Sequence, residues 1–91
     1  MKKYELNEFK ALDLSGYAIA DTRKPEIFVN GFIEDSVSIP FDDSFTDTLQ
    51  ELISADLKVM IVADEADVAA IVKTVKSSGL NNIAGYLAGG F

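Results

Sequence analysis

Residues 57–63, LKVMIVA, form the most continuous apolar run of the chain. A half-exposed strand alternates apolar and polar residues, whereas an uninterrupted run of this kind is typical of a strand covered on both faces. Such a strand lies inside a parallel sheet, with helices packed on each side of it. The run therefore predicts an α/β protein with residues 57–63 as its central strand.

Shorter segments with helical and strand periodicity alternate around this run. Helices are expected at residues 6–14, 25–31, 44–53 and 68–78, and strands at 17–21, 36–40, 57–63 and 83–86. Gly31 and Gly79 each stand where a glycine would cap the end of a helix. The alternation favours one small three-layer α/β domain over residues 1–91, with a mostly parallel sheet of about four to five strands flanked by helices.

The residue types that are missing exclude several kinds of chemistry. The 91 residues include no cysteine and no histidine, so disulfides, thiolate metal sites, thiol catalysis and imidazole bases are excluded. The net charge of −7 and the sequence pI of about 4.3 disfavour binding to nucleic acids or anionic membranes. The N-terminal segment does not resemble a signal peptide, and no apolar run is long enough to span a bilayer. A cytoplasmic location is the expectation.

The sequence turns acidic where the central strand is expected to end. In α/β proteins the corner between the carboxyl end of a strand and the next helix is a usual place for a functional site. We call this segment the acidic corner; its residues are Val62, Ala63, Asp64, Glu65, Ala66 and Asp67. Its carboxylates complement the positive end of a helix dipole and can cap free N–H groups there. The corner contains no cysteine, serine, histidine or lysine.

Residues 20–42 resemble the opening motif of rhodanese-like domains. That motif runs from a strand through Asp-x-Arg, an acidic-aromatic helical turn and Gly-His-Ile to Asn-Ile-Pro. The residues that match it in register are Asp21, Arg23, Glu26, Phe28, Gly31, Ile33, Ile39 and Pro40. Two positions differ, because Phe32 stands in place of the histidine and Ser38 in place of the asparagine.

Residues 58–91 are similar to the second half of the same family: a central strand, an active-site loop, a helix, a further strand and a Gly-Gly turn. The tail is similar to that of rhodanese-like domains fused to metallo-β-lactamase-fold hydrolases, in which the loop is often degenerate. The residues that fit this pattern are Asn82, Gly85, Tyr86, Leu87, Gly89 and Gly90. The family normally continues into a further helix, so residues 1–91 are expected to be an excised or truncated domain, or a domain whose partner supplies that packing.

The resemblance implies a domain without the reaction of its family. An active rhodanese has a cysteine just after the central strand, where loop N–H groups and a helix N-terminus stabilise its thiolate. Alignment of the following helix puts that position at about Val62 or Ala63. The resemblance therefore implies an inactive sulfurtransferase homologue, with no catalytic residue and no cofactor. Its expected role is that of an interaction or structural module beside a metal-dependent hydrolase domain.

Other interpretations of the same residues stay open at this stage. Asp64, Glu65 and Asp67, with Asp42 and Asp43, could hold a divalent metal ion. The chain could also be a stand-alone protein-binding domain or a homodimer, using aromatic residues exposed near the acidic corner. Asp21 and Arg23 could form a catalytic pair, but hydrogen bonds that hold neighbouring loops are the favoured interpretation. Glycine turns explain Gly85, Gly89 and Gly90 better than a phosphate loop does.

Overall fold

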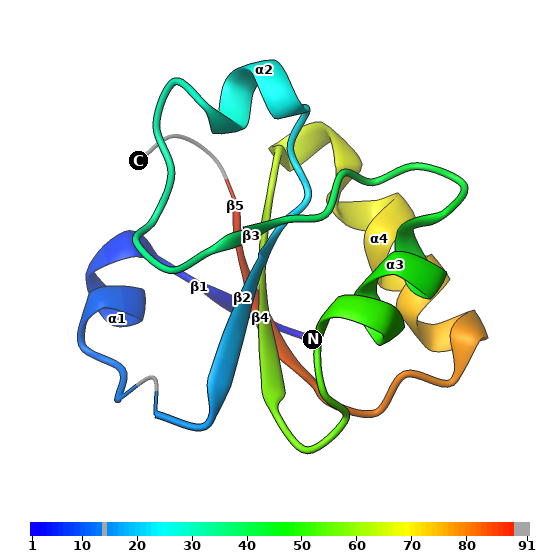
Figure 1. Cartoon of the computed structure of the whole chain (residues 1–91). Coiled ribbons are helices and arrows are strands. Elements are labelled where there is room, and N and C mark those ends of the chain that lie inside the picture. The colour runs from blue at the N-terminus through cyan, green and yellow to red at the C-terminus, as the bar shows by residue number, and fades with distance from the viewer. Residues whose placement is uncertain (14, 89–91) are drawn as a thin grey trace.

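Five parallel strands form a single sheet in a computed structural model of the protein, which describes residues 1–13 and 15–88 (Figure 1). The order of the strands across the sheet is β1-β5-β4-β2-β3. Their bounds are Lys2–Tyr4 for β1, Tyr17–Asp21 for β2, Val37–Ser38 for β3, Lys58–Ala63 for β4 and Ile83–Ala88 for β5. The α/β class and the predominantly parallel sheet predicted from the sequence are confirmed.

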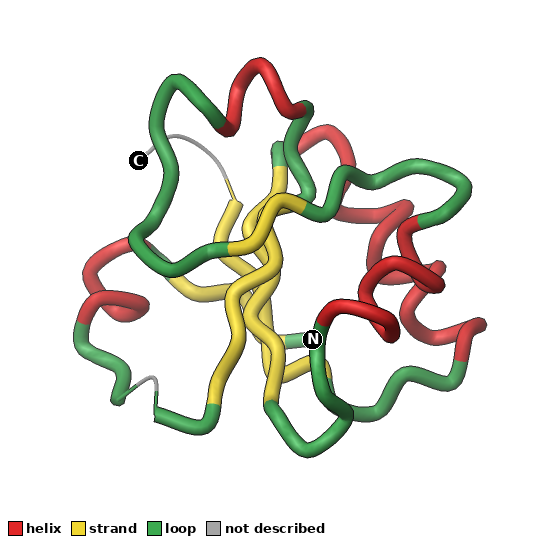
Figure 2. Tube along the Cα trace, viewed as in Figure 1, coloured by secondary structure: helices red, strands yellow, loops and turns green. Residues whose placement is uncertain are grey.

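Helices cover both faces of the sheet (Figure 2). They are α1 at Leu6–Lys10, α2 at Pro25–Phe28, α3 at Phe45–Leu52 and α4 at Val68–Ser78, and the 3-10 turn η1 at Glu65–Asp67 precedes α4. One hydrophobic cluster joins α3 and α4 to β4 through Phe45, Leu49 and Ile71. A second cluster on the opposite face joins α1 to the sheet through Phe9. None of the helices in the described residues is long and apolar enough to cross a bilayer.

Strand β4 lies in the middle of the sheet, as its composition predicts. It pairs with β2 on one side and with β5 on the other. All its residues except Lys58 are buried. Val59, Ile61 and Ala63 point into the cluster under α3 and α4, whereas Met60 and Val62 point into the cluster under α1. This alternation explains the uninterrupted apolar run, because each face of the strand meets a different helical layer.

Two expectations about the N-terminal part of the chain are wrong. No strand is expected from the sequence at residues 2–4, but they form β1 and pair with residues 85–87 of β5. The helix expected at 6–14 ends at Lys10, and Leu14 lies outside the described residues. Asp13 accepts hydrogen bonds from the backbone N–H and the hydroxyl of Ser15, and this local turn competes with a longer helix.

Of the two glycines expected to cap helices, Gly79 does so and Gly31 does not. Gly79 ends α4 with φ +76°, in the left-handed conformation that glycine adopts at little cost. Gly31 is not a left-handed cap, because α2 ends at Phe28 with Val29 in right-handed helical geometry. Gly31 contributes its carbonyl oxygen instead, which accepts a hydrogen bond from Arg23.

Candidate functional site

The acidic corner begins inside the sheet rather than in solvent. Val62 and Ala63 are the last two residues of β4, and their exposed fractions are 0% and 1%. They point to opposite faces and belong to different hydrophobic clusters. The first residue of the corner with access to solvent is Asp64, which is half-buried. The two positions aligned with a family nucleophile are therefore enclosed by the core.

Thr22 closes the end of β4 from the side of β2. Its backbone N–H and its hydroxyl both donate to the carbonyl oxygen of Val62, each at 2.8 Å. Thr22 is buried, and its hydroxyl is satisfied by this bond. The sequence does not predict this role for Thr22, because nothing near a threonine that follows a strand indicates its distant hydrogen-bond partner.

The carboxylates of the corner do not make the side-chain caps that the sequence suggests. Asp64 precedes η1 and Asp67 precedes α4, but neither side chain accepts a capping hydrogen bond. The corner is closed by its backbone, because the N–H of Asp67 donates to the carbonyl oxygen of Asp64 at 2.9 Å. The carboxylates still place negative charge where an incoming anion would otherwise meet the N-terminus of α4.

One lysine from the other end of the chain reaches the acidic corner. Lys3 of β1 lies 3.4 Å from Glu65, and both side chains are exposed. The hydrogen bond to Glu65 raises the pKa of Lys3 above its ordinary value. This contact is not predictable from the sequence, because it depends on the unexpected strand β1.

Asp21 and Arg23 form a buried ion pair beside the corner. Asp21 is fully buried, and its Oδ1 accepts bonds from the backbone N–H and the Nε of Arg23, both at 3.0 Å. The Nη2 of Arg23 lies 2.7 Å from Asp21 Oδ2 and 2.7 Å from the carbonyl oxygen of Gly31. The hydrogen bond to Asp21 raises the pKa of Arg23, burial opposes this, and the charge of Asp64 adds to it. The pair ties the end of β2 to the loop after α2.

Two further motif residues, Pro40 and Gly85, affect how the strands pair. Pro40 follows the edge strand β3, between Ile39 and Phe41, whose N–H groups donate to the carbonyl oxygens of Asp21 and Thr22. The proline therefore removes no donor from that pairing. A Cβ atom on Gly85 would lie 2.6 Å from the carbonyl oxygen of Lys2, so β1 can approach β5 only at a glycine. Gly89 and Gly90 lie outside the described residues.

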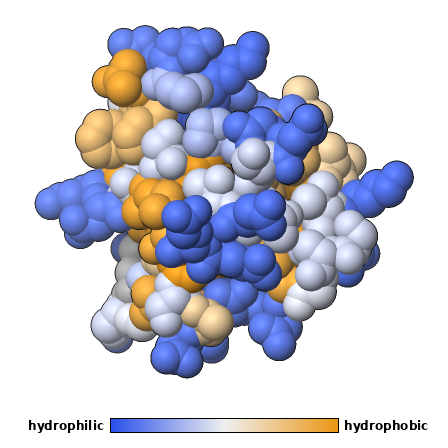
Figure 3. Space-filling view, turned by 45° about the vertical axis from the view of Figure 1, so that its right-hand side comes forward, coloured by the Kyte–Doolittle hydropathy of each residue, from blue (hydrophilic) through white to orange (hydrophobic). Residues whose placement is uncertain are grey.

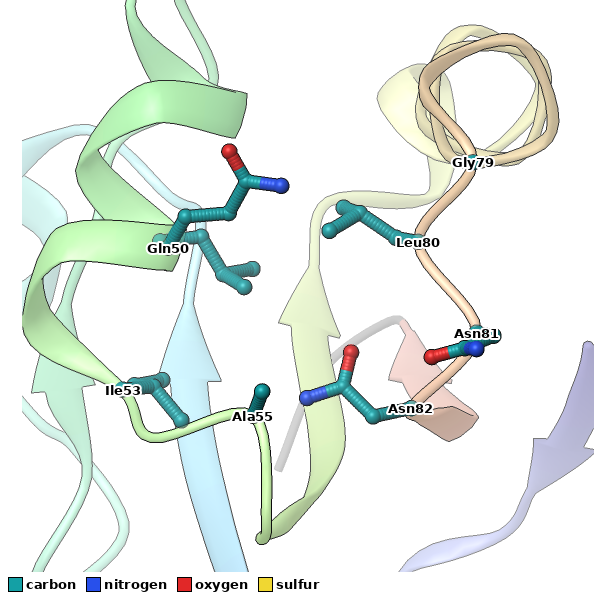
Figure 4. A pocket seen from close by; sticks show the side chains of 8 residues that line it. Gln50, Ile53, Ala55, Gly79, Leu80, Asn81 and Asn82 are labelled. Carbon is teal, nitrogen blue, oxygen red and sulfur yellow. The ribbon is translucent and has the colours of Figure 1, made fainter.

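Two further observations concern where a metal ion or a small ligand could bind. Within residues 1–13 and 15–88, no three acidic side chains are arranged to hold a metal ion, so the metal-site interpretation has no geometric support. A pocket of about 140 Å³ lies near the opposite end of β4, where α4 ends at Gly79 (Figure 4). It is lined by apolar side chains and by the amides of Gln50, Asn81 and Asn82, with no ionisable group.

Comparison with known proteins places this arrangement in a family. The sequence model of the rhodanese-like domain family matches residues 5–91. A metallo-β-lactamase from Staphylococcus aureus subsp. aureus COL is similar, with 25% identity and a TM-score of 0.69 over 85% of this chain and 23% of that one. The wild-type structure of EanB shares the fold at 16% identity and a TM-score of 0.68, over 93% of this chain and 23% of that one.

The search of curated proteins gave no match. The chain spans about a quarter of the length of these two solved structures. The family match covers nearly all of the chain, and it agrees with the parallel sheet and with the Asp21–Arg23 motif at the end of β2. This protein belongs to the rhodanese-like domain family.

Proposed function

We propose that this chain is a non-catalytic rhodanese-like module that serves as an interaction or structural domain associated with a metallo-β-lactamase-fold hydrolase. The observation that carries the proposal is the acidic corner. It contains no thiol, Val62 and Ala63 are enclosed in the core, and Asp64 is the first residue to reach solvent.

The electrostatics of the corner argue against sulfur transfer independently of the missing cysteine. A reactive thiolate needs nearby positive charge or free N–H groups that lower its pKa. Here Asp64, Glu65 and Asp67 precede α4, and the nearby Arg23 is held by Asp21 and Gly31. These carboxylates would raise the pKa of a thiol introduced at the corner and would repel anions such as thiosulfate.

The association with a hydrolase rests on the likeness to the staphylococcal metallo-β-lactamase. In that protein the matched region is 23% of the chain, so the fold is one part of a larger molecule there. The present sequence contains no histidine and no cysteine. The metal ligands of such a hydrolase would therefore belong to another domain, and this module would provide contacts rather than chemistry.

The proposal is tested by assaying thiosulfate:cyanide sulfurtransferase activity in the unaltered protein and in the Asp64→Cys variant. We expect no thiocyanate formation above background from either protein. Turnover that scales with the concentration of the unaltered protein would contradict the non-catalytic assignment. Turnover by the variant alone would contradict the electrostatic argument.

The association is tested by the complete reading frame. A His-x-His-x-Asp-His motif in the same polypeptide would support the fusion. A gene that encodes this domain alone would contradict it and would favour the second candidate, a stand-alone protein-binding domain. The observation in favour of that candidate is the apolar surface around α2 described below.

A further inference from the structure

An apolar patch lies on α2 and the loop that follows it, and its four side chains are exposed or half-buried. We define this apolar patch as Ile27, Phe28, Val29 and Phe32. The rings of Phe28 and Phe32 are stacked, with centroids 4.6 Å apart and planes 10° from parallel. Val29 is 70% exposed and Phe32 is 52% exposed. Single exposed aliphatic side chains are ordinary on protein surfaces, but adjacent ones beside a stacked ring pair are typical of contact sites.

The patch is held in a fixed shape by the backbone around it. Pro25 begins α2, and the side-chain amide of Asn30 donates to the carbonyl oxygen of Glu26 at 2.9 Å. The N–H of Gly31 donates to the carbonyl oxygen of Phe28, while the carbonyl oxygen of Gly31 accepts from Arg23. Phe32 therefore follows directly on a residue anchored to the buried ion pair. A surface ordered in advance loses little entropy on binding.

Arg23 also connects the apolar patch to the acidic corner. Its guanidinium donates a hydrogen bond to the carbonyl oxygen of Gly31, and the charge of Asp64 helps to raise the pKa of Arg23. Both α2 and η1 follow carboxyl ends of strands, so they lie at the same edge of the sheet (Figure 1). In the space-filling view, apolar and hydrophilic areas lie side by side on the visible face (Figure 3).

The charges at this edge are mostly negative. The carboxylates in its loops and in the first turn of α2 are Glu26, Asp42, Asp43, Asp64, Glu65 and Asp67. Of the basic residues there, Arg23 is paired with Asp21, Lys3 is paired with Glu65, and Lys24 at the start of α2 is exposed. An apolar centre with an acidic surround is complementary to an apolar side chain flanked by basic ones.

We propose that the apolar patch and the acidic corner form one docking surface for a basic protein segment that presents an aliphatic or aromatic side chain between lysines or arginines. The inference rests on the proposed function as an interaction module and names the chemistry of its partner. A second copy of the chain fits less well, because two acidic edges would face each other. Anionic lipid headgroups are repelled for the same reason.

The experiment uses a synthetic peptide as the probe, acetyl-Lys-Lys-Leu-Phe-Leu-Lys-Lys-amide. It is titrated into isotope-labelled protein, and the shifts of the backbone amides are followed by NMR. We expect the shifts to concentrate on residues 26–32 and 64–67 and the affinity to fall as sodium chloride is added. Two comparison peptides replace the lysines by glutamates or the apolar residues by serines, and both should bind more weakly.

A pair of variants distinguishes binding at the apolar patch from non-specific hydrophobic binding elsewhere on the surface. The double variant Val29→Ser/Phe32→Ser should bind the probe about tenfold more weakly. The control Leu52→Ser should bind like the unaltered protein, because Leu52 is 57% exposed but lies on α3. Circular dichroism establishes that each variant is folded. If the double variant is unfolded, the location of the shifts in the unaltered protein decides the question.

Several outcomes would overturn the proposal. They are shifts confined to other surfaces, equal binding of the glutamate peptide, and an equal loss of affinity in the Leu52 control. A dimer in sedimentation analysis that the double variant dissociates would overturn it in favour of a second copy. These results are independent of the sulfurtransferase assay, so failure of the docking surface is distinguishable from failure of the proposed function.

Discussion

Arg23 contacts both the end of β2 and the loop after α2. It makes a fork of hydrogen bonds to the buried carboxylate of Asp21, and it anchors the loop after α2 through Gly31. Planar guanidinium groups suit such two-point contacts with carboxylates better than ammonium groups do. The Asp-x-Arg motif therefore has a structural role here, and it fixes the position of the apolar patch.

Replacing Arg23 by alanine should destabilise the domain by about 3 kcal/mol, because the buried carboxylate of Asp21 would lose its ionic partner. Lysine at the same position should recover only part of this loss. The free energy of unfolding is measured by urea titration. The exposed neighbour Lys24 is the control, and Lys24→Ala should change stability by no more than about 0.5 kcal/mol. Equal effects at the two positions would contradict the structural role of the pair.

The burial of Ala63 can be measured directly, because the natural chain has no cysteine and a single introduced thiol reports on its own surroundings. Ala63→Cys should react with Ellman's reagent at least about tenfold more slowly than Leu52→Cys, since one side chain is in the core and the other is exposed. Asp64→Cys should react at an intermediate rate. Similar rates for the first two variants would show that the end of β4 is open to solvent.

At the scale of elements, the sheet depends on a close approach between β1 and β5. These strands come from opposite ends of the described chain, and Lys2 is paired with Gly85. The absence of a side chain on Gly85 leaves space for the carbonyl oxygen of Lys2 and for the ring of Tyr4. Strand β1 in turn places Lys3 beside Glu65. One glycine thus positions a charge at the acidic corner.

Gly85→Ala should cost about 2 kcal/mol of stability, because the added Cβ atom would lie 2.6 Å from a backbone oxygen and one strand must move. The matched control is Gly31→Ala, since a Cβ atom on Gly31 meets nothing within 4 Å. That variant should stay within about 0.5 kcal/mol of the unaltered protein. Urea titration of both variants makes the comparison. Equal stabilities would contradict the tight packing of β1 against β5.

For the whole molecule, the excess of acidic residues is the dominant electrostatic feature. The net charge is −7, and repulsion among carboxylates opposes the compact state. Among the described residues, the buried Asp21–Arg23 ion pair is shielded from salt, and the exposed Lys3–Glu65 pair contributes little. Screening by salt should therefore weaken the repulsion among carboxylates more than it weakens the attraction within ion pairs.

Sodium chloride is accordingly expected to raise the midpoint of thermal unfolding. A gain of about 1 kcal/mol corresponds to about 4–8 °C for a domain of this size. In the double variant Asp42→Asn/Asp43→Asn the increase should be smaller, because both residues are exposed and add to the negative charge. Differential scanning calorimetry over a salt series measures it. A midpoint that falls with salt would show that attractive surface pairs dominate.

Prediction from the sequence succeeded where the signal is local. The apolar run at 57–63 identified the central strand, and Ser78-Gly79 identified the end of α4, because burial on both faces and a left-handed cap leave marks in adjacent residues. Prediction failed for β1, which was not expected as a strand, and for Gly31, which was expected to cap α2. A three-residue strand has no periodicity to detect, and the hydrogen-bond partner of Gly31 is the side chain of Arg23, eight residues away.

The sequence by itself determined the α/β class, the central strand and the absence of thiol and imidazole chemistry, since these follow from residue types and short-range patterns. Only the tertiary structure decided that Val62 and Ala63 are enclosed, that Thr22 closes the end of β4 and that Phe32 is stacked at the surface. The physical reason is that burial and hydrogen bonding at a strand end depend on partners from distant segments. The fold fixes those partners, and the local sequence does not name them.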